Sequence, residues 1–202
     1  MKNLIFDFGG VIIDIQPMAY VSELLNMGCN DLQGLHAAFI QEGVYRKFET
    51  GQLSASEFRD RIRHCLSDHA SDGEIDHAWN LIIGEIPAHR IQWLQELKAK
   101  YRTFLLSNTN PIHYEHYQEY TLRTFGFPLN SLFEKAYFSF QMDMYKPDHE
   151  IFEFVLNDSG LNPAETVFID DMAENVEAAR KCGMSGIVVK PGDDVTEIMK
   201  DF

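Results

Sequence analysis

Asn3-Leu4-Ile5-Phe6-Asp7-Phe8-Gly9-Gly10-Val11-Ile12-Ile13-Asp14 is the stretch that decides how the rest of the chain is interpreted. Its apolar run, rich in β-branched and aromatic residues, is typical of a buried strand. Asp7 ends the first part of that run, and two glycines follow that permit a sharp turn or a close approach of the backbone to a ligand. Open α/β sheets bind ligands at the carboxyl ends of their strands, so Asp7 is a candidate site residue. On this stretch alone, an aspartate that caps a turn fits equally well.

The composition sets limits on both fold and function. With 202 residues, 45% of them hydrophobic, the chain can bury a sizeable core without disulfides. Its net charge of −14 arises from 17 basic and 31 acidic side chains. Such a surface repels phosphate backbones, so we expect neither nucleic acid nor an anionic membrane as a main partner. An anionic substrate would need a local positive charge.

The cysteines and the apolar runs point to a cytoplasmic protein. Cys29, Cys65 and Cys182 are odd in number and have no CxxC spacing, which favours structural thiols in a reducing compartment. Asp7 interrupts the N-terminal apolar run too early for a signal peptide. No apolar run approaches the ~20 residues that a membrane-spanning helix needs.

The pattern of predicted helices and strands changes at Pro87. Between Pro17 and Ile86 the apolar spacing predicts four helices and no strand, with a capping box at Ser54-Ala55-Ser56-Glu57. Beyond Pro87, helices alternate with short apolar strands, expected at 103–106, 136–140, 167–169 and 186–189.

This alternation predicts an α/β fold, namely a Rossmann-like parallel sheet with right-handed crossovers. We expect a core made of residues 1–14 plus 88–202 and, inserted after the first strand, a helical-bundle cap of residues 15–87. Such a cap would lie over the ligand-binding edge and select substrates.

Polar residues recur where the predicted strands end, at Asp7, Ser107, Lys146 and the pair Asp170-Asp171. Two carboxylates ~4 Å apart repel by roughly 4 kcal/mol at an effective dielectric of 20, so a cluster of them must take up protons or hold a cation. Oxygen ligands with high negative charge favour Mg²⁺, which uses one or two carboxylates, water and substrate phosphate. A plain helix cap at Asp170-Asp171 stays open as an alternative.

Two further groups suit an anionic ligand. Ser107-Asn108-Thr109-Asn110 follows a strand and precedes a helix start at Pro111, where side-chain and backbone donors favour phosphate. Lys146, within Tyr145-Lys146-Pro147, supplies the local positive charge. The alternatives are an ordinary N-cap cluster and a solvated surface lysine.

Taken together, these segments resemble the motifs of the haloacid dehalogenase-like (HAD) hydrolase superfamily. In order along the chain, the four are Asp7-Phe8-Gly9-Gly10-Val11, Leu106-Ser107-Asn108-Thr109-Asn110, Lys146-Pro147, and Ile169-Asp170-Asp171 with Asn175. The chain is also similar to bacterial α-D-glucose-1-phosphate phosphatases and to the epoxide hydrolase N-terminal phosphatase-like group. That narrower similarity depends on Ser107–Asn110, His113, Phe168–Asp171 and the cap stretch Phe48–Ser54.

The resemblance implies a role for each matching residue. Asp7 would be the nucleophile that forms an aspartyl-phosphate. Ser107, Asn108 and Lys146 would bind the phosphoryl group of a small phosphorylated substrate. Mg²⁺ would be held by Asp7, the carbonyl oxygen of Gly9, Asp171 directly, and Asp170 directly or through water. Members with small caps are monomers or homodimers, and composition does not decide between the two.

Gly9 departs from the family pattern. Most phosphatases of this superfamily carry an aspartate two residues after the nucleophile, and general acid–base help of this kind contributes about 10²–10⁴-fold. Either the substrate has an easier leaving group, such as a sugar 1-phosphate, or His113, a cap residue or water replaces the acid. His113 and His116 lie three residues apart without a third ligand, which is a poor match to a zinc site.

Other members of the superfamily remain as alternatives. A dehalogenase needs no Mg²⁺, so Asp170-Asp171 argues against it. A phosphonatase needs a cap lysine, and the cap's only one, Lys47, lies near Arg46, Glu49 and Arg59, a pattern that indicates a solvated face. Phosphomutases rely on the acid that Gly9 replaces, and a phosphate-binding protein without activity is the non-enzymatic alternative.

Overall fold

A parallel sheet forms the base of the molecule in the computed structural model, which describes residues 2–66 and 69–202. Within these residues the sheet has five strands in the order β3-β2-β1-β4-β5, so the predicted α/β sheet is confirmed. The strands are β1 (Asn3–Phe6), β2 (Arg102–Ser107), β3 (Lys135–Phe138), β4 (Thr166–Asp170) and β5 (Ser185–Val188). The third strand ends earlier than predicted, because α8 (Ser139–Met142) begins there. Met1, Ser67 and Asp68, assigned above to the core and the cap, lie outside the described residues.

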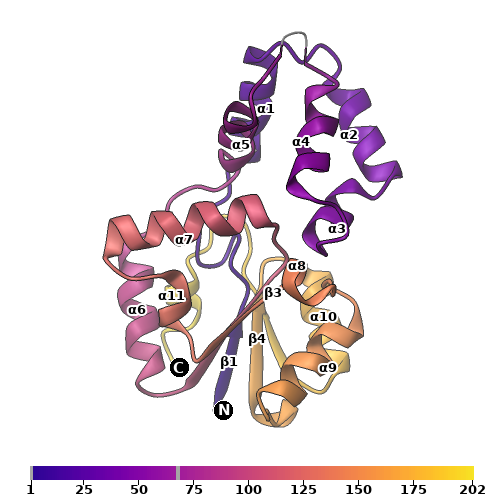
Figure 1. Ribbon diagram of the computed structural model, residues 1–202. Coiled ribbons are helices and arrows are strands. Elements are labelled where there is room, and N and C mark those ends of the chain that lie inside the picture. The colour runs from indigo at the N-terminus through magenta and orange to yellow at the C-terminus, as the bar shows by residue number, and fades with distance from the viewer. Residues whose placement is uncertain (1, 67–68) are drawn as a thin grey trace.

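Two layers of helices cover the sheet (Figure 1). Leu4 and Phe6 of β1 face a hydrophobic cluster that includes residues of α6 (Ala88–Lys98), α7 (Pro111–Phe125) and α11 (Val195–Ile198). Ile5 faces the opposite cluster, formed with α9 (His149–Asp158) and α10 (Ala173–Lys181). Burial on both sides explains why β1 has a continuous apolar sequence. Two short 3₁₀ helices, η1 (Leu129–Leu132) and η2 (Pro163–Glu165), complete this part.

The remaining helices form the cap above the sheet in Figure 1. They are α1 (Pro17–Asn26), α2 (Leu32–Gln41), α3 (Val44–Glu49), α4 (Ala55–Arg63) and α5 (Asp72–Asn80). The prediction of four helices was wrong, because α3 spans only six residues and shows too little periodicity to detect. The predicted capping box between Ser54 and Glu57 is present. Phe48, Phe58 and Trp79 help to give the cap its own hydrophobic core.

The chain enters and leaves the cap through two segments that run side by side. Gln16 N donates to Ile82 O at 2.7 Å, and Gly84 N donates to Asp14 O at 2.8 Å. Because only these two bonded segments carry the chain across, the cap has one narrow covalent junction with the sheet. Its boundaries at residues 14 and 88 stay a prediction.

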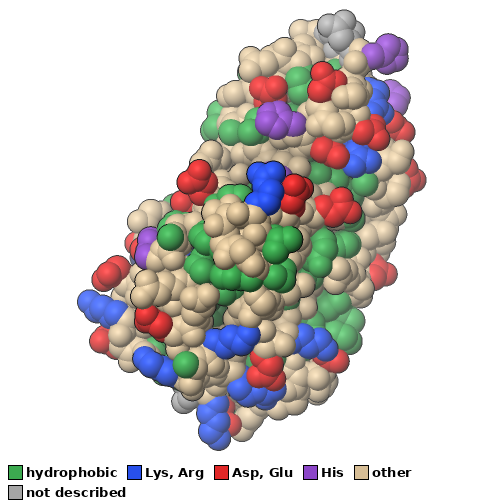
Figure 2. Space-filling view, turned by 60° about the vertical axis from the view of Figure 1, so that its left-hand side comes forward, with side chains coloured by type: hydrophobic (Ala, Val, Ile, Leu, Met, Phe, Trp, Pro, Cys, Tyr) green, Lys and Arg blue, Asp and Glu red, His purple; other side chains and the backbone are tan. Residues whose placement is uncertain are grey.

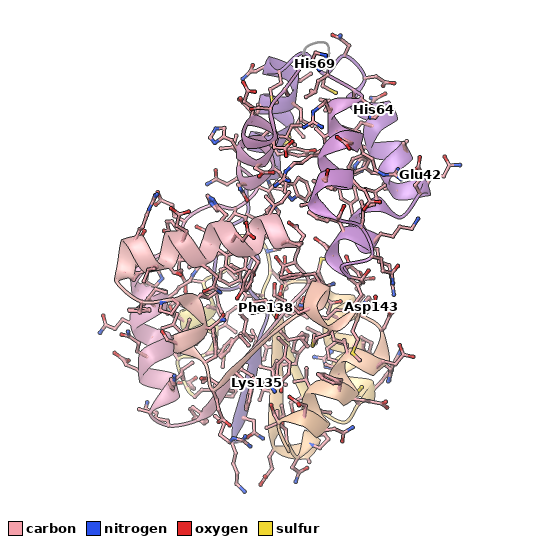
Figure 3. The ribbon with its side chains drawn as sticks, in the orientation of Figure 1. Glu42, His64, His69, Lys135, Phe138 and Asp143 are labelled. Carbon is pink, nitrogen blue, oxygen red and sulfur yellow. The ribbon has the colours of Figure 1, made fainter. Side chains whose placement is uncertain are left out.

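Polar contacts join α3 and the turn after it to the loop that follows α8. Arg46 forms an ion pair with Asp148, and Gln52 Nε2 donates to Asp143 Oδ1 at 2.8 Å. Asp143 is labelled in Figure 3, near the lower end of the cap. Gly51 allows this approach, because its φ of +78° suits glycine and an added Cβ would lie 2.5 Å from Phe140 O.

Charged side chains of both signs are interspersed over the face of the molecule seen in Figure 2. None of the helices within residues 2–66 and 69–202 is both long enough and apolar enough to cross a membrane.

Candidate functional site

Three aspartates meet at the carboxyl edge of the sheet. Asp7 directly follows β1, Asp170 ends the neighbouring strand β4, and Asp171 comes next. One oxygen from each carboxylate lies within 4.8 Å of the others, and Asp7 and Asp170 are buried. The structure therefore brings together the carboxylates that the sequence assigns to one site.

Lys146 lies among these carboxylates and is only 2% exposed, so it is not a surface lysine. Its Nζ donates to Asp7 Oδ1 at 2.8 Å, to Asp170 Oδ2 at 2.7 Å and to the carbonyl oxygen of Leu106 at 3.0 Å. An ammonium has three N–H donors, and all three are used here. Burial lowers the pKa of Lys146, but Asp170 and Asp7 raise it by more, so the side chain carries its charge.

Asp170 is held on both oxygens. Asn175 Nδ2 donates to Oδ1 at 3.0 Å and to Oδ2 at 3.1 Å, and Met172 N donates to Oδ1 at 2.8 Å. Neither aspartate is the N-cap residue of α10, which is Met172. The helix-cap alternative therefore does not account for the pair, and Asp170 has fewer free lone pairs for a ligand than a solvated carboxylate.

Asp171 occupies space that a glycine leaves open. Gly10 has a φ of +69°, and a Cβ there would lie 2.5 Å from Asp171 Oδ2. Burial and the neighbouring Asp170 raise the pKa of the Asp171 carboxyl above its usual value. This is the electrostatic signature of a crowded anionic site.

The charge of the cluster fits a divalent cation. Burial raises the pKa of Asp7 to about 7, although Lys146 opposes that effect. One lysine cannot balance three ionised carboxylates, so a bound cation would stabilise the ionised forms. A set of carboxylate oxygens is the donor set that Mg²⁺ prefers. Gly9 lies in the adjoining turn, where Ile12 N and Ile13 N donate to Phe8 O at 2.9 and 3.0 Å.

The residues Ser107–Asn110, at the end of β2 and just after it, each make different hydrogen bonds. The Asn108 side chain donates to Lys146 O and accepts from Lys146 N, each at 3.0 Å, so it braces the lysine's main chain. Thr109 N donates to Ser139 Oγ at 2.9 Å. Asn110 caps α7 by accepting from His113 N at 3.0 Å. Ser107 is buried, and within residues 2–66 and 69–202 its hydroxyl makes one long bond of 3.4 Å, to Asn108 O, so it can rotate toward a ligand at little cost.

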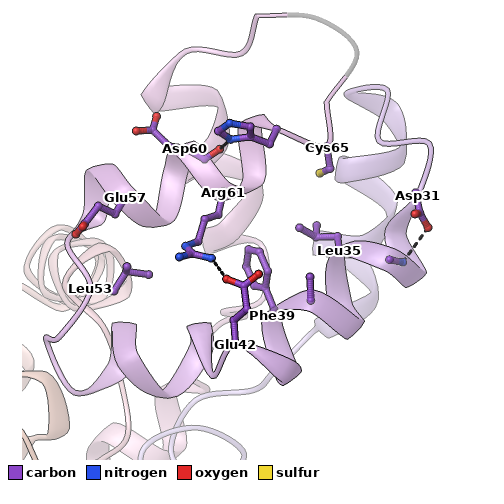
Figure 4. A pocket seen from close by; sticks show the side chains of 12 residues that line it. Asp31, Leu35, Phe39, Glu42, Leu53, Glu57, Asp60, Arg61 and Cys65 are labelled. Carbon is purple, nitrogen blue, oxygen red and sulfur yellow. Dashed lines mark hydrogen bonds and ion pairs between the residues drawn. The ribbon is translucent and has the colours of Figure 1, made fainter.

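A cavity of about 210 Å³ lies beside this segment, between the sheet edge and the cap. The core lines it with Phe8, Gly9, Ile13, Ser107, Asn108, Thr109 and His113, and the cap and its junction line it with Ile15, Glu49, Trp79, Ile82 and Ile83. A larger cavity of about 710 Å³ lies between α2 and α4 within the cap, where Arg61 pairs with Glu42 (Figure 4). None of the site residues predicted from the sequence lines that larger cavity.

Comparison with known proteins decides the family. A family model described as haloacid dehalogenase-like hydrolase matches residues 1–183. The chain belongs to this family. It is 32% identical to the D-ribitol-5-phosphate phosphatase of Bacteroides thetaiotaomicron, over 96% of this chain and 94% of that protein. It is also 26% identical to the phosphorylated carbohydrates phosphatase of Thermotoga maritima, over 93% of this chain and 84% of that one.

Among solved structures, the chain is similar to a HAD family enzyme of Bacteroides thetaiotaomicron crystallised with magnesium and inorganic phosphate. The TM-score is 0.91 at 35% identity, and the match covers 98% of this chain and 99% of that one. The protein is thus a HAD-like hydrolase whose relatives include named phosphatases.

His113 does not fit the acid missing at Gly9 of this HAD-like hydrolase. The ring is stacked on Trp79, with 4.7 Å between centroids. Nε2 lies 3.1 Å from Trp79 O, and Nδ1 lies 3.1 Å from Asn110 Nδ2. Burial lowers the pKa of His113 to about 4, so the imidazole is neutral at pH 7 and both nitrogens are engaged. Within residues 2–66 and 69–202, neither His113 nor His116 belongs to a cluster of three metal-ligating side chains.

Glu49 was assigned to a solvated face, and this was wrong. Lys47 is exposed as expected, but Glu49 is partly buried, lines the small cavity and accepts a bond of 3.0 Å from the hydroxyl of Tyr145. Burial raises the pKa of Glu49 to about 7, and Tyr145 and Lys146 oppose this effect. No local feature of the sequence marks this burial, because the contact with Tyr145 joins residues 96 positions apart.

Proposed function

We propose that this HAD-like hydrolase is a Mg²⁺-dependent phosphatase that acts on a small phosphorylated metabolite through an aspartyl-phosphate on Asp7. The observation that carries the proposal is the cluster at the sheet edge, where Lys146 joins Asp7 to Asp170 and Asp171 lies within reach of both. Relatives named as phosphatases, one structure of which contains magnesium and phosphate, support it.

The metal would be held by Asp7, Asp170 and Asp171 and by the carbonyl oxygen of Gly9. A bound Mg²⁺ supplies positive charge that offsets the charge on the phosphoryl oxygens and favours the ionised nucleophile. Asp171 would bind the metal directly. Asp170 already accepts hydrogen bonds from Asn175, Met172 and Lys146, so it would bind the metal either directly or through a water molecule.

Asp7 performs the first chemical step. Its carboxylate oxygen attacks phosphorus, the bond from phosphorus to the leaving oxygen breaks, and the electron pair departs with that oxygen. Lys146 fixes the orientation of Asp7 through Oδ1 and offsets its charge. Ser107 donates to the phosphoryl group, and Asn108 serves by holding Lys146 in place. Water then hydrolyses the acyl phosphate and regenerates Asp7.

We infer that the substrate is a phosphorylated sugar or sugar alcohol. Two relatives are named for D-ribitol 5-phosphate and for phosphorylated carbohydrates. The cavity of about 210 Å³ beside Ser107 is smaller than the roughly 300–1,000 Å³ typical of drug-sized ligands, which favours a small leaving group. A sugar 1-phosphate stays within this class.

The test is phosphate release from a panel of sugar and sugar-alcohol phosphates, with Mg²⁺ and with a chelator. Wild type should turn over at least one member, the chelator should abolish turnover, and D7N should be inactive. Equal turnover by D7N and wild type would exclude the aspartyl-phosphate route. No turnover by either, with tight binding of a substrate, would favour the non-enzymatic alternative.

A further inference from the structure

The structure offers no acid at the position where most phosphatases of this superfamily carry one. Gly9 has no side chain, and the space where its Cβ would lie is taken by Ile15 Cδ1, 2.6 Å away. His113 is neutral and has both nitrogens engaged. The leaving oxygen of a sugar phosphate is a poor leaving group unless it is protonated, so another donor must face the cavity.

Glu49 faces that cavity from the cap. It lines the same cavity of about 210 Å³ as Gly9, Ser107 and Asn108, so its carboxyl shares a space with the residues that flank the nucleophile. Phe8, Gly9 and Ser107, which flank Asp7 in sequence or at the sheet edge, also line this cavity, so a leaving group that enters it from Asp7 would meet Glu49. Within the described part of the chain, Glu49 is the one acidic side chain among the cavity's lining residues.

The position of Glu49 is fixed by contacts on both sides of it. Tyr145, adjacent to Lys146, donates its hydroxyl hydrogen to Glu49 Oε2. Arg46, one turn earlier on α3, pairs with Asp148 and lies over the ring of Tyr145, 5.0 Å from its centroid. Gly51 lets this part of the cap come close to Phe140. A group held in this way is pre-organised, which proton transfer requires.

The surroundings favour a protonated carboxyl near neutral pH. The cavity wall beside Glu49 includes Trp79, Ile82 and Ile83, which offer no polar side chain to an ionised carboxylate apart from the indole. The titratable and charged groups around Glu49 are Tyr145, Lys146, Tyr45, Arg46 and neutral His113. Burial outweighs the two of these groups that lower the pKa of Glu49, Tyr145 and Lys146, and a pKa of about 7 gives the carboxyl both protonation states near neutral pH.

We propose that Glu49 is the general acid and base that replaces the carboxylate missing at Gly9; this rests on the function proposed above. When Asp7 attacks, the leaving oxygen takes the electron pair of the broken phosphorus–oxygen bond and the proton of the Glu49 carboxyl. In the second step, Glu49 takes a proton from the water that attacks the aspartyl-phosphate, and phosphate leaves. Each cycle consumes one water and restores both carboxyl groups.

The first experiment separates acid catalysis from substrate binding. Single-turnover release of the leaving alcohol is measured with Mg²⁺ for a sugar-alcohol phosphate and for p-nitrophenyl phosphate, whose phenolate departs without a proton. E49Q should slow the first by about 10²–10⁴-fold and the second by less than about tenfold. E42Q, on an exposed glutamate of the cap, should change neither.

Equal slowing of both substrates by E49Q, or of neither, would refute the role of Glu49. D7N should abolish release from both substrates. If D7N retains release, the proposed function fails whatever E49Q does, so the two failures are distinguishable.

The second experiment uses the pH profile. Tyr145 donates to the carboxylate form of Glu49 and so lowers its pKa. Y145F should therefore move the basic limb of kcat/KM for the sugar-alcohol phosphate to higher pH, and E49Q should remove that limb. If the limb stays at the same pH in both variants, Glu49 is not the group that titrates, and the assignment is wrong.

Discussion

Lys146 Nζ donates to Asp7 Oδ1 at 2.8 Å across a separation of 139 residues, and the same nitrogen bonds Asp170. One positive charge thus partly offsets two buried carboxylates that lie at the ends of neighbouring strands. Removing one partner of a buried ion pair costs about 3–5 kcal/mol, because the remaining charge is left uncompensated.

We therefore expect K146M to lower the free energy of unfolding by about 3–5 kcal/mol and to abolish turnover. Added Mg²⁺ should recover part of the lost stability, since it supplies positive charge to the same carboxylates. Denaturant unfolding with and without Mg²⁺ measures both effects. K47M, on the exposed lysine of α3, is the control and should be neutral within ~0.5 kcal/mol.

Asp171 is expected to be the residue whose loss weakens metal binding most directly. D171N should reduce Mg²⁺ affinity by about tenfold or more, since about 1.4 kcal/mol of lost attraction is already tenfold. Calorimetric titration of Mg²⁺ into the protein measures this. D193N removes an exposed acidic group from a cavity that Asp171 also lines, and it should leave the affinity within about twofold of wild type. Equal weakening by both variants would indicate a diffuse electrostatic effect.

Gly51 and Gly43 form a matched pair for the contact between cap and core. Both have positive φ, +78° and +64°, so alanine at either incurs a left-handed penalty of about 1–2 kcal/mol. A Cβ at Gly51 also meets Phe140 O, whereas at Gly43 nothing lies within 4 Å. G51A should thus lower kcat/KM strongly, while G43A lowers only stability. Parallel unfolding and kinetic measurements would show whether the two variants differ in this way.

His113 should make the protein less stable in mild acid. Its pKa is about 4 in the folded state and near 6.5 when unfolded, so the unfolded chain binds more protons between these values. The free energy of unfolding is therefore unaffected by His113 protonation above about pH 6.5, and it falls by about 3 kcal/mol as the pH drops toward 4. H113N should lack this pH dependence. The difference in unfolding free energy between wild type and H113N should therefore change between pH 6.5 and 4. A constant difference over that range would contradict the assignment.

The sequence predicted much of this architecture because the signals were local. Three of these signals depend only on residues close together in the sequence: the apolar run before Asp7, the capping box at Ser54 and the alternation beyond Pro87. Each corresponds to an observed element. The convergence of Asp7 and Asp170 followed from one rule about the carboxyl ends of parallel strands. The placement of Lys146 at a strand end was wrong, because it reaches the two carboxylates from the loop after α8.

What the sequence did not predict depends on contacts between distant segments. The bond of Tyr145 to Glu49 joins residues 96 positions apart, and a charged residue beside Arg46 and Lys47 gives no sign that it is covered. Asn108 offered the donors of a ligand-binding residue, and only the fold shows both ends of its amide on the main chain of Lys146. Helix α3 was missed because a single turn and a half shows too little periodicity.

The paired segments at Gln16–Ile82 and Asp14–Gly84 have an evolutionary consequence. Everything between them is a module with its own apolar interior, attached at one place and specified by its own stretch of gene. We expect mutations there, other than at Glu49, to change which ligand is accepted while Lys146 and the carboxylates at the sheet edge keep their arrangement. Relatives with different physiological roles can therefore arise by variation in this module alone.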